Sequence, residues 1–426
     1  MDLGNLLLNN ISPKQTFFKN SFWLFLSQGL SRLFKLILII VSARILNPTG
    51  FGTFNYILSI ASFFFIAADW GISNLIIREY QQSEQKEKYI RVSFLFRLIA
   101  TALCFIAAFA GLFVFQNPEF RINFLIISIY LFISNIKDFL VSFLRAIQKM
   151  EKEFIVILVE GFSVMAFGIF LILIHRNIIS LSFGYLIGVF LSLLTAILMT
   201  RSYKEYFKPQ FDKETFKKIL KDGFPMLLFG ILGFIFFSTD QIMLGKMRNV
   251  TEVGYYSLIT KGVLLINLIP SLIMVALFPY LSANVNDKEK IKKLTKKVVL
   301  AFIGLGLLIS ILVFFLAPLI PLIVGQSYKP SLGLAQFLIW IIVFMFPAAY
   351  FSYFYLAYNK QMLSFYLTAI SAIINLVLNF LLIPKYGMYG AAATSLFAQL
   401  LNFLLLWIFS KKVFQSPIST PSAAQN

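Results

Sequence analysis

Residues 298–317 read VVLAFIGLGLLISILVFFLA, twenty consecutive residues without a charged side chain. At a rise of 1.5 Å per residue, a helix of this length spans about 30 Å, the thickness of the hydrocarbon core of a bilayer. Six lysines precede the stretch within residues 288–297, and Pro318 follows it. The stretch therefore predicts a transmembrane helix preceded by a basic, solvated loop.

The composition of the whole chain agrees with this reading. Of the 426 residues, 59% are hydrophobic and 13% are charged, whereas soluble domains have about 45–50% and about 25%. A water-soluble enzyme is therefore excluded, and an all-α integral membrane protein is expected, because unpaired backbone groups are not tolerated in lipid. We expect twelve spans, at residues 20–45, 52–76, 92–115, 122–144, 154–174, 179–200, 222–244, 254–280, 298–317, 331–357, 362–383 and 389–410.

Basic residues are distributed unequally between the two sides of the expected spans. Of the 37 Lys and Arg residues, 25 fall on the side that contains the N-terminus and seven on the other. Because loops rich in Lys and Arg stay in the cytoplasm, both termini are predicted to be cytoplasmic. This bias also accounts for the net charge of +19 without nucleic acid. The first apolar run is long and carries charge, so we expect it to remain as an anchor in the inner membrane.

A weak internal repeat suggests two six-helix halves. Residues 47–54 and 249–256 share the pattern Asn-x-Thr-x-x-Gly-x-aromatic, and each segment joins the first two spans of a half. The longest expected cytoplasmic connection, residues 201–221, is basic and lies between the sixth and seventh spans. We therefore predict an N-terminal lobe at residues 1–208 and a C-terminal lobe at residues 209–426, a known plan for transporters.

Four segments carry a resemblance to a known family. Residues 42–52, 68–72, 240–245 and 386–392 read SARILNPTGFG, ADWGI, DQIMLG and YGMYGAA. They resemble the O-antigen and polysaccharide flippases, the polysaccharide exporter branch of the multidrug/oligosaccharidyl-lipid/polysaccharide superfamily. The resemblance implies about twelve helices in two lobes around a central cavity. It also implies that the chain is not an enzyme and that it moves undecaprenyl-diphosphate-linked oligosaccharide across the bacterial inner membrane by alternating access.

Charged residues inside the expected spans are the candidate functional groups, because each costs about 2.5–3.5 kcal/mol near the bilayer centre. We expect the basic residues to bind the anionic diphosphate, with interior ion pairs as the alternative. We expect the acidic residues either to pair with these cations or to bind a coupling proton or sodium ion. The basic residues are Arg32, Lys35, Arg97, Lys137 and Lys261, and the acidic ones are Asp69, Asp138, Glu160 and Asp240.

Three of the cations have informative positions. Arg32 and Lys35 are three residues apart and share a helix face near mid-depth, from which neither side chain easily reaches an interface. Lys261 lies about eight residues into the eighth expected span. In the family that the chain resembles, the first and eighth helices belong to opposite lobes and flank a lateral opening. Arg97, five residues from a cytoplasmic end, has snorkelling as its alternative. Asn375 and Asn379 favour a role in helix packing over ligand binding.

Several other functions are less well supported by the sequence. A multidrug or cation antiporter of the same superfamily should have a cavity dominated by carboxylates. A polysaccharide polymerase or glycosyltransferase usually needs a large outer loop or an Asp-x-Asp pair, and the sequence has neither. One histidine, His175, and one cysteine, Cys104, make a protein-built metal site improbable, and no cofactor is expected. The expected partners are the lipid-linked oligosaccharide, membrane lipids and the machinery of lipopolysaccharide or capsule polymerisation, without nucleic acid.

Overall fold

The computed structural model describes residues 13–415, and all regular structure in this range is helical. The chain forms two compact units, which divide between Phe234 and Ile235. The all-α membrane fold expected from the sequence is confirmed. The first unit contains α2 (Pro13–Phe65), α3 (Ile72–Gln82), α4 (Lys86–Gly111), η1 (Leu112–Val114), α5 (Pro118–Ala146), α6 (Met150–His175), α7 (Ile178–Thr200), η2 (Arg201–Phe207) and the first part of α8 (Lys213–Met247).

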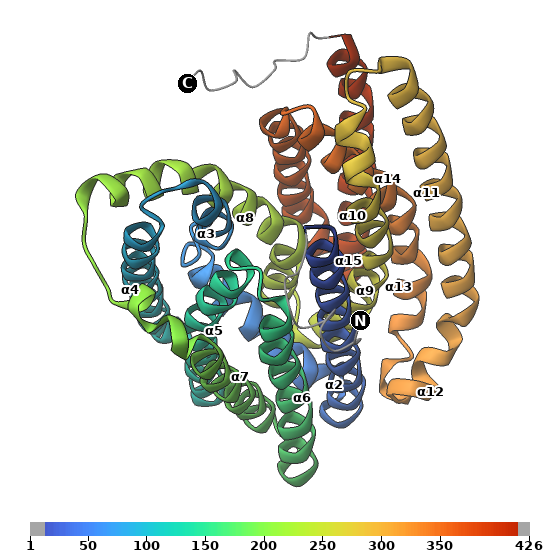
Figure 1. Cartoon of the computed structure of the whole chain (residues 1–426). Helices are drawn as coiled ribbons and strands as arrows, with labels where there is room; N and C mark the ends of the chain where they lie inside the picture. The colour runs from blue at the N-terminus through green and yellow to red at the C-terminus, as the bar shows by residue number, and fades with distance from the viewer. Residues whose placement is uncertain (1–12, 416–426) are drawn as a thin grey trace. The chain divides into compact units, whose positions relative to one another are not determined.

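The second unit begins within α8. It continues with α9 (Val250–Ile266), α10 (Leu268–Ala283), α11 (Lys288–Leu316), η3 (Ala317–Leu319), α12 (Ile320–Val324), η4 (Gln326–Tyr328), α13 (Ser331–Leu338), η5 (Ile339–Ile341), α14 (Ile342–Ala357) and α15 (Gln361–Gln415). Helix α14 forms the buried centre of this unit, where it packs against α10, α11 and α15. Figure 1 shows α11 at the edge of the unit, leading to α12.

Within the described range, ten helices are long and apolar enough to cross a membrane. Three of the ten contain a non-helical residue: Asn47 in α2, Tyr203 in η2, which continues α7, and Gly387 in α15. Asn47 and Gly387 lie near the places where expected spans meet. In α15 the chain reverses: Thr368 Oγ1 donates a hydrogen bond of 3.1 Å to Asn402, 34 residues away. A straight helix would separate these residues by about 50 Å. The count of twelve spans stays a prediction.

The turn in α15 requires glycine. Gly387 has a positive φ of 56°, and a Cβ atom there would lie 2.1 Å from Glu252 Oε2. The same carboxylate oxygen accepts a hydrogen bond of 2.7 Å from the Met388 amide. The turn is therefore closed by a carboxylate that leaves no room for a side chain.

The expected span at residues 52–76 is not one helix, and this prediction was wrong. Helix α2 ends at Phe65 and α3 begins at Ile72, with Trp70 and Gly71 at positive φ between them. These residues continue an apolar run, so the composition did not indicate that the helix ends here. Non-helical backbone at membrane depth is tolerated where protein satisfies it, and the carbonyl of Ala68 accepts a hydrogen bond of 3.1 Å from Arg97 Nη1.

The basic segment at residues 288–297 was expected to be a loop. This prediction was wrong, because the segment is helical. Helix α11 begins at Lys288, and Asp287 caps it by accepting a hydrogen bond of 2.9 Å from the Lys290 amide. Asp212 similarly accepts a hydrogen bond of 3.0 Å from the Thr215 amide at the start of α8. Both aspartates are N-cap residues. They extend the helices beyond their apolar cores.

The first turns of α8 pack on other helices of the first unit. Two ion pairs hold them: Lys218 Nζ lies 2.7 Å from Glu79, and Asp222 lies 2.9 Å from Arg78. Gly223 fits so closely that a Cβ atom there would lie 2.2 Å from the carbonyl oxygen of Trp70. The indole of Trp70 donates a hydrogen bond of 3.2 Å to the carbonyl of Leu220.

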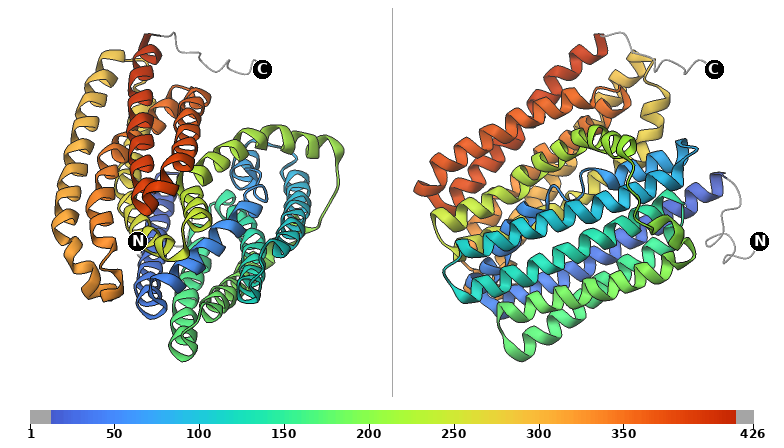
Figure 2. Two further views of the ribbon diagram at one scale, coloured as in Figure 1. Left: turned by 180° about the vertical axis from the view of Figure 1, so that it is seen from behind. Right: turned by 90° about the vertical axis from the view of Figure 1, so that its left-hand side faces the viewer.

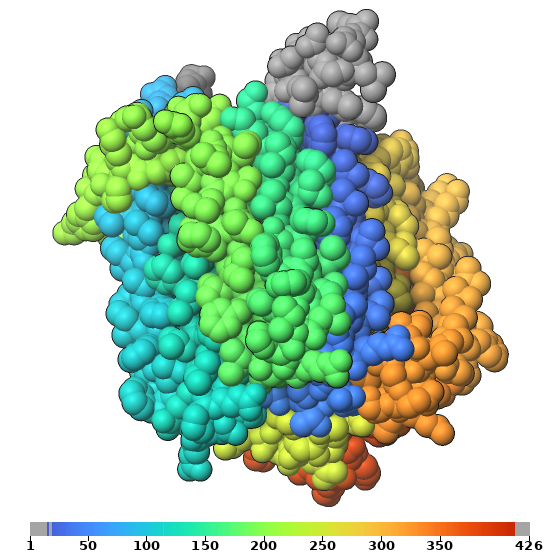
Figure 3. Space-filling model, turned by 90° about the horizontal axis from the view of Figure 1, so that it is seen from below, coloured from blue at the N-terminus to red at the C-terminus, as the bar shows by residue number. Residues whose placement is uncertain are grey.

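Helices α6 and α7 pack through glycine, as is common where membrane helices approach closely. A Cβ atom on Gly184 would lie 2.4 Å from Gly168 Cα, and one on Gly188 would lie 2.4 Å from a methyl group of Val164. The right-hand view of Figure 2 shows α5, α6 and α7 side by side, and Figure 3 shows α6 and α7 (two greens) in contact. Large apolar side chains remain on the surface, including Phe113, which is 75% exposed, as expected for a protein surrounded by lipid.

Candidate functional site

The charged residues inside the spans form separate polar clusters. In the first unit, Arg97 is 1% exposed and donates hydrogen bonds to four acceptors. Its guanidinium lies 2.5 Å from Asp69 and also reaches Ser73 Oγ and the carbonyls of Ala68 and Asn135. It therefore joins α4, α5, α3 and the turn before α3. Snorkelling is excluded as an explanation, because the guanidinium is buried and its donors bond to protein acceptors.

The second cluster of this unit places one lysine between two carboxylates. Lys137 Nζ on α5 lies 2.9 Å from Asp138 Oδ1 and forms an ion pair with Glu160 on α6. The lysine is buried, whereas the Asp138 side chain is 50% exposed. Ser134 Oγ donates a hydrogen bond of 3.3 Å to the other oxygen of Asp138. With all three groups ionised, the cluster carries one negative charge in excess.

Two tyrosines accompany these carboxylates. Tyr130 lies on α5, eight residues before Asp138 and on the same face of the helix. Its ring meets that of Tyr185 on α7 edge to face, with the ring centroids 5.5 Å apart. Both tyrosines are partly exposed. The site therefore offers ring surfaces beside negatively charged oxygens.

The remaining predicted cations are in different surroundings. Arg32 is half-buried on α2 and Lys35 is exposed, and neither has an ion-pair partner among residues 13–415. Lys261 on α9 is half-buried and does have an interaction. The two clusters already described contain the other two predicted cations, Arg97 and Lys137.

In the second unit, Asp240 on α8 is 3% exposed and accepts hydrogen bonds from neutral groups. Tyr256 Oη and Ser395 Oγ each lie 2.5 Å from Oδ2, and Asn379 Nδ2 lies 2.6 Å from Oδ1. Asn379 also accepts a hydrogen bond from Thr394 Oγ1 across the turn of α15. The carboxylate therefore joins α8, α9 and both arms of α15.

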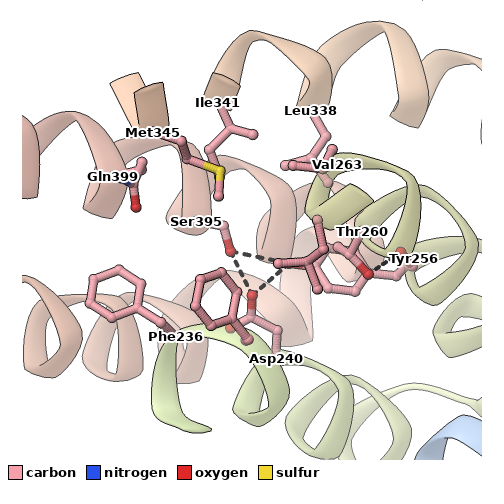
Figure 4. Close-up of a pocket in the computed structure, with 12 residues that line it drawn as sticks. Phe236, Asp240, Tyr256, Thr260, Val263, Leu338, Ile341, Met345, Ser395 and Gln399 are labelled. Atoms are coloured by element: carbon pink, nitrogen blue, oxygen red, sulfur yellow. Dashed lines mark hydrogen bonds between the residues drawn. The ribbon is translucent and has the colours of Figure 1, made fainter. Parts of the chain in front are cut away.

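A small cavity adjoins Asp240. Figure 4 shows Asp240, Ser395 and Tyr256 linked by hydrogen bonds, with Met345 and Gln399 nearby. The cavity has a volume of ≈ 40 Å³, and about 10–15 Å³ is enough for one water molecule. Oxygen atoms and a negative charge favour small, hard cations. Asp240 could therefore hold a proton or a small cation there. No cluster of three or more His, Cys, Asp or Glu residues with metal-ligand geometry occurs in the described range.

Sequence reasoning found Asp240 but missed its hydroxyl partners. Asn375 and Asn379 were expected to pack helices, and Asn379 does link two arms of α15 while it also donates to Asp240. Ser395 gave no signal, because a serine in an apolar helix usually bonds to its own backbone. The aromatic position of the repeated pattern, Tyr256, was the one available clue.

The fold and these clusters define a class: multi-pass membrane proteins that hold ionisable groups within their spans. The sequence pattern of the family described as "Polysaccharide biosynthesis protein" matches residues 17–285, more than half of the chain. The chain therefore belongs to this family, and the resemblance to polysaccharide exporters is confirmed. A second pattern, MatE, matches residues 225–381.

Individual relatives agree with the family assignment. The chain is 24% identical to the capsular polysaccharide biosynthesis protein CapF of Staphylococcus aureus, over 93% of this chain and 100% of the relative. Among solved structures, it is similar to the lipid II flippase MurJ in an inward closed conformation. That similarity has a TM-score of 0.72 and 18% identity, over 91% of this chain and 88% of MurJ.

A multidrug resistance MATE family transporter of the MOP superfamily, in an inward-facing conformation, is also similar. Its TM-score is 0.66 with 12% identity, and 99% of each chain is covered. At these identities, the structural comparisons show the fold alone. They establish that this chain has the helical fold shared by MurJ and MATE transporters.

Proposed function

We propose that the protein is a flippase that carries undecaprenyl-diphosphate-linked oligosaccharide, such as O-antigen or capsule repeat units, across the bacterial inner membrane. The observation that carries the proposal is the pair Arg32 and Lys35. These cations lie on one face of a membrane-spanning helix and have no ion-pair partner among residues 13–415. An unpaired cation within a span is costly, so its presence favours binding of an anionic ligand. A diphosphate accepts charge-assisted hydrogen bonds from such cations.

Alternating access supplies the motion in this proposal. The predicted lobes, residues 1–208 and 209–426, would expose the cargo site to each side in turn. We place both termini in the cytoplasm, as the distribution of basic residues indicates. Cysteine labelling in a Cys104→Ala background tests the orientation: residues 213–221 and 288–297 should react from the cytoplasm, and Lys246→Cys should react from the periplasm.

An ion gradient drives the cycle in this proposal, because the sequence has no ATP-binding motif. Asp240 is the candidate coupling residue, since its carboxylate is buried among neutral donors. Binding of a proton or sodium ion would neutralise it, and the two facing states would differ in their affinity for that ion.

The function is tested in cells from which the gene is deleted. Lipid-linked repeat units should accumulate on the cytoplasmic face and should disappear when the wild-type protein is restored. Expression of Arg32→Ala at the same membrane abundance should leave most of the accumulation in place. Normal surface polysaccharide without accumulation in the deletion strain would show that this protein does not move the cargo.

A multidrug exporter is the second candidate, because the MatE pattern matches residues 225–381 and Asp138 is a half-exposed carboxylate within a span. This function predicts that the deletion strain becomes more sensitive to cationic drugs, with no change in lipid-linked glycans. Under the leading proposal, the glycan phenotype appears and drug sensitivity stays as in the wild type.

A further inference from the structure

We propose that Asp138, Glu160, Tyr130 and Tyr185 form a subsite that binds the sugar hydroxyl groups of the cargo. The inference rests on the proposed function and adds the part of the ligand that this site recognises. All four residues lie in the first unit, on α5, α6 and α7. The proposal therefore depends on the geometry of one compact unit.

The residues from α5 form a single stripe. Tyr130, Ser134 and Asp138 are spaced four residues apart, so their side chains lie above one another on one helix face. Ser134 donates to Asp138, and Glu160 is joined to the same position through Lys137. On α7, Tyr185 extends the ring surface from Tyr130 to Phe54, whose ring centroid is 5.1 Å from that of Tyr185.

The exposure of Asp138 at its depth requires a polar environment. This residue is eight positions before the end of α5 at Ala146, about 12 Å along the helix. A half-exposed carboxylate this far inside a span cannot face lipid at acceptable cost. It therefore faces water or a polar ligand.

The charge arrangement disfavours a mobile cation at this site. The ammonium of Lys137 already lies between the two carboxylates, in contact with both. A further cation would meet the repulsion of this ammonium together with the attraction of the two carboxylates, so only one net negative charge is left to hold it. A neutral donor meets no such repulsion.

The remaining hydrogen-bonding capacity suits a sugar. A carboxylate has about four acceptor positions, and Asp138 uses one oxygen for Lys137 and the other for the long bond from Ser134. Sugar hydroxyls can donate to the unused positions. The hydroxyl of Tyr130 can bond to a further sugar hydroxyl, and the tyrosine rings can cover the apolar faces of the sugar. Arg97 takes no part, because its donors are committed to protein acceptors.

The experiment compares two probes on the purified full-length protein in lipid nanodiscs. One probe is undecaprenyl diphosphate without sugar, and the other is the lipid-linked oligosaccharide extracted from the deletion strain. We expect Asp138→Asn to weaken binding of the sugar-bearing probe about tenfold and to leave binding of the bare diphosphate unchanged within about twofold. Tyr130→Phe, which keeps the ring and removes the hydroxyl, should show the same selectivity with a smaller effect. Glu205→Gln, at an exposed cytoplasmic position, is the matched control and should change neither affinity.

Equal weakening of both probes by Asp138→Asn would overturn the proposal, since the residue would then act on the diphosphate or on the fold. Unchanged binding of both probes by Asp138→Asn and Tyr130→Phe would overturn it as well. A change in the sodium or pH dependence of binding, without loss of sugar discrimination, would identify a cation site and would also overturn it. If the wild-type protein binds neither probe, the proposed function itself fails, and this result is distinct from the other three.

Discussion

Both units place carboxylates inside membrane-spanning helices, but they compensate the charge differently. In the first unit, Asp69 pairs with Arg97, and the two acids Asp138 and Glu160 share Lys137. In the second unit, the donors to Asp240 are the hydroxyls of two side chains and one amide. The acids of the first unit have their charge balanced by a cation of the protein, whereas Asp240 has only neutral donors, so a bound proton or small cation could balance its charge.

The exposures of the two acids add to this contrast. Asp138 is 50% exposed and can meet a bulky ligand, whereas Asp240 is 3% exposed beside a cavity of ≈ 40 Å³. A glycan is far too large for the second environment. Under the functions proposed above, ligand recognition would belong to the first unit and ion exchange to the second, and four experiments test this division.

The largest expected effect comes from removing Arg97. Breaking a buried ion pair leaves an uncompensated charge and typically costs about 3–5 kcal/mol. Because Asp69 is 40% exposed, we expect Arg97→Met to lower the free energy of unfolding by about 3 kcal/mol, the low end of that range. Melting of the purified protein in detergent measures this loss. The double variant Arg97→Met/Asp69→Asn should recover part of it. If Arg97→Met kept the wild-type melting temperature but lost export, Arg97 would bind the cargo and would not stabilise the fold.

The second effect is on transport through Asp240. We expect Asp240→Asn to reduce export more than about tenfold at normal membrane abundance, because an amide cannot exchange a proton or bind a cation and coupling energies are typically 1–3 kcal/mol. Stability should be retained, since Tyr256 and Ser395 can reorient their hydroxyls toward the amide. Surface polysaccharide per unit of membrane protein measures the effect. Asp287→Asn, the same change at an exposed helix cap, should export normally. Full export by Asp240→Asn would remove the coupling role.

Arg32 and Lys261 provide the third test, since they are the cations predicted to meet the diphosphate. Loss of one charge-assisted contact worth about 1.4 kcal/mol weakens cargo binding about tenfold. We therefore expect Arg32→Ala and Lys261→Ala to lose most surface polysaccharide, and Arg32→Lys and Lys261→Arg to keep part of it. Quantitative immunoblots of the membrane fraction serve as the abundance control. Wild-type export by both alanine variants would show that these cations contact lipid or protein only.

The smallest effect concerns Asp212, a carboxylate outside the membrane whose partner is the cation Lys88, 2.9 Å away. Hydrogen bonds from the hydroxyl and amide of Thr215, followed by Lys88, lower the pKa of Asp212 to about 2. A lowered folded-state pKa means that the contribution to stability is present above the unfolded value and is lost as the pH falls through about 2. The melting difference between the wild type and Asp212→Asn should therefore be small and constant from pH 8 to pH 5. A difference that grows or vanishes within that range would contradict the assignment.

The sequence predicted the helical class and the family well, because both depend on long apolar runs and short loop motifs. It did not predict the break at residues 66–71, because these residues continue a long apolar run interrupted by Asp69 alone, and composition does not reveal the positive φ of Trp70 and Gly71. The partner of Lys137 was also out of reach. Glu160 lies 23 residues away on another helix, and their meeting depends on how the two helices are rotated.

For the Asp240 cluster, the sequence predicted the charged residue but not its hydrogen-bond partners. The charge stood out in an apolar span, so the acid was found. Its hydroxyl partners Tyr256 and Ser395 lie 16 and 155 residues further along the chain. Tyrosine and serine are common in membrane helices for reasons of packing, so composition alone did not separate these two from the rest.

The docking of the first turns of α8 on the first unit has a consequence for how the protein can be divided. A chain cut near Lys208 leaves residues 213–234 on the C-terminal fragment, although these residues belong to the compact unit formed by the N-terminal fragment. The pairs Lys218–Glu79 and Asp222–Arg78, together with the fit of Gly223 against Trp70, then become contacts between two polypeptides. The C-terminal fragment would thus bind the N-terminal fragment through residues 213–234. Fragment complementation should be efficient at this cut and poor at a cut after Phe234, which interrupts α8 and leaves these contacts within one fragment.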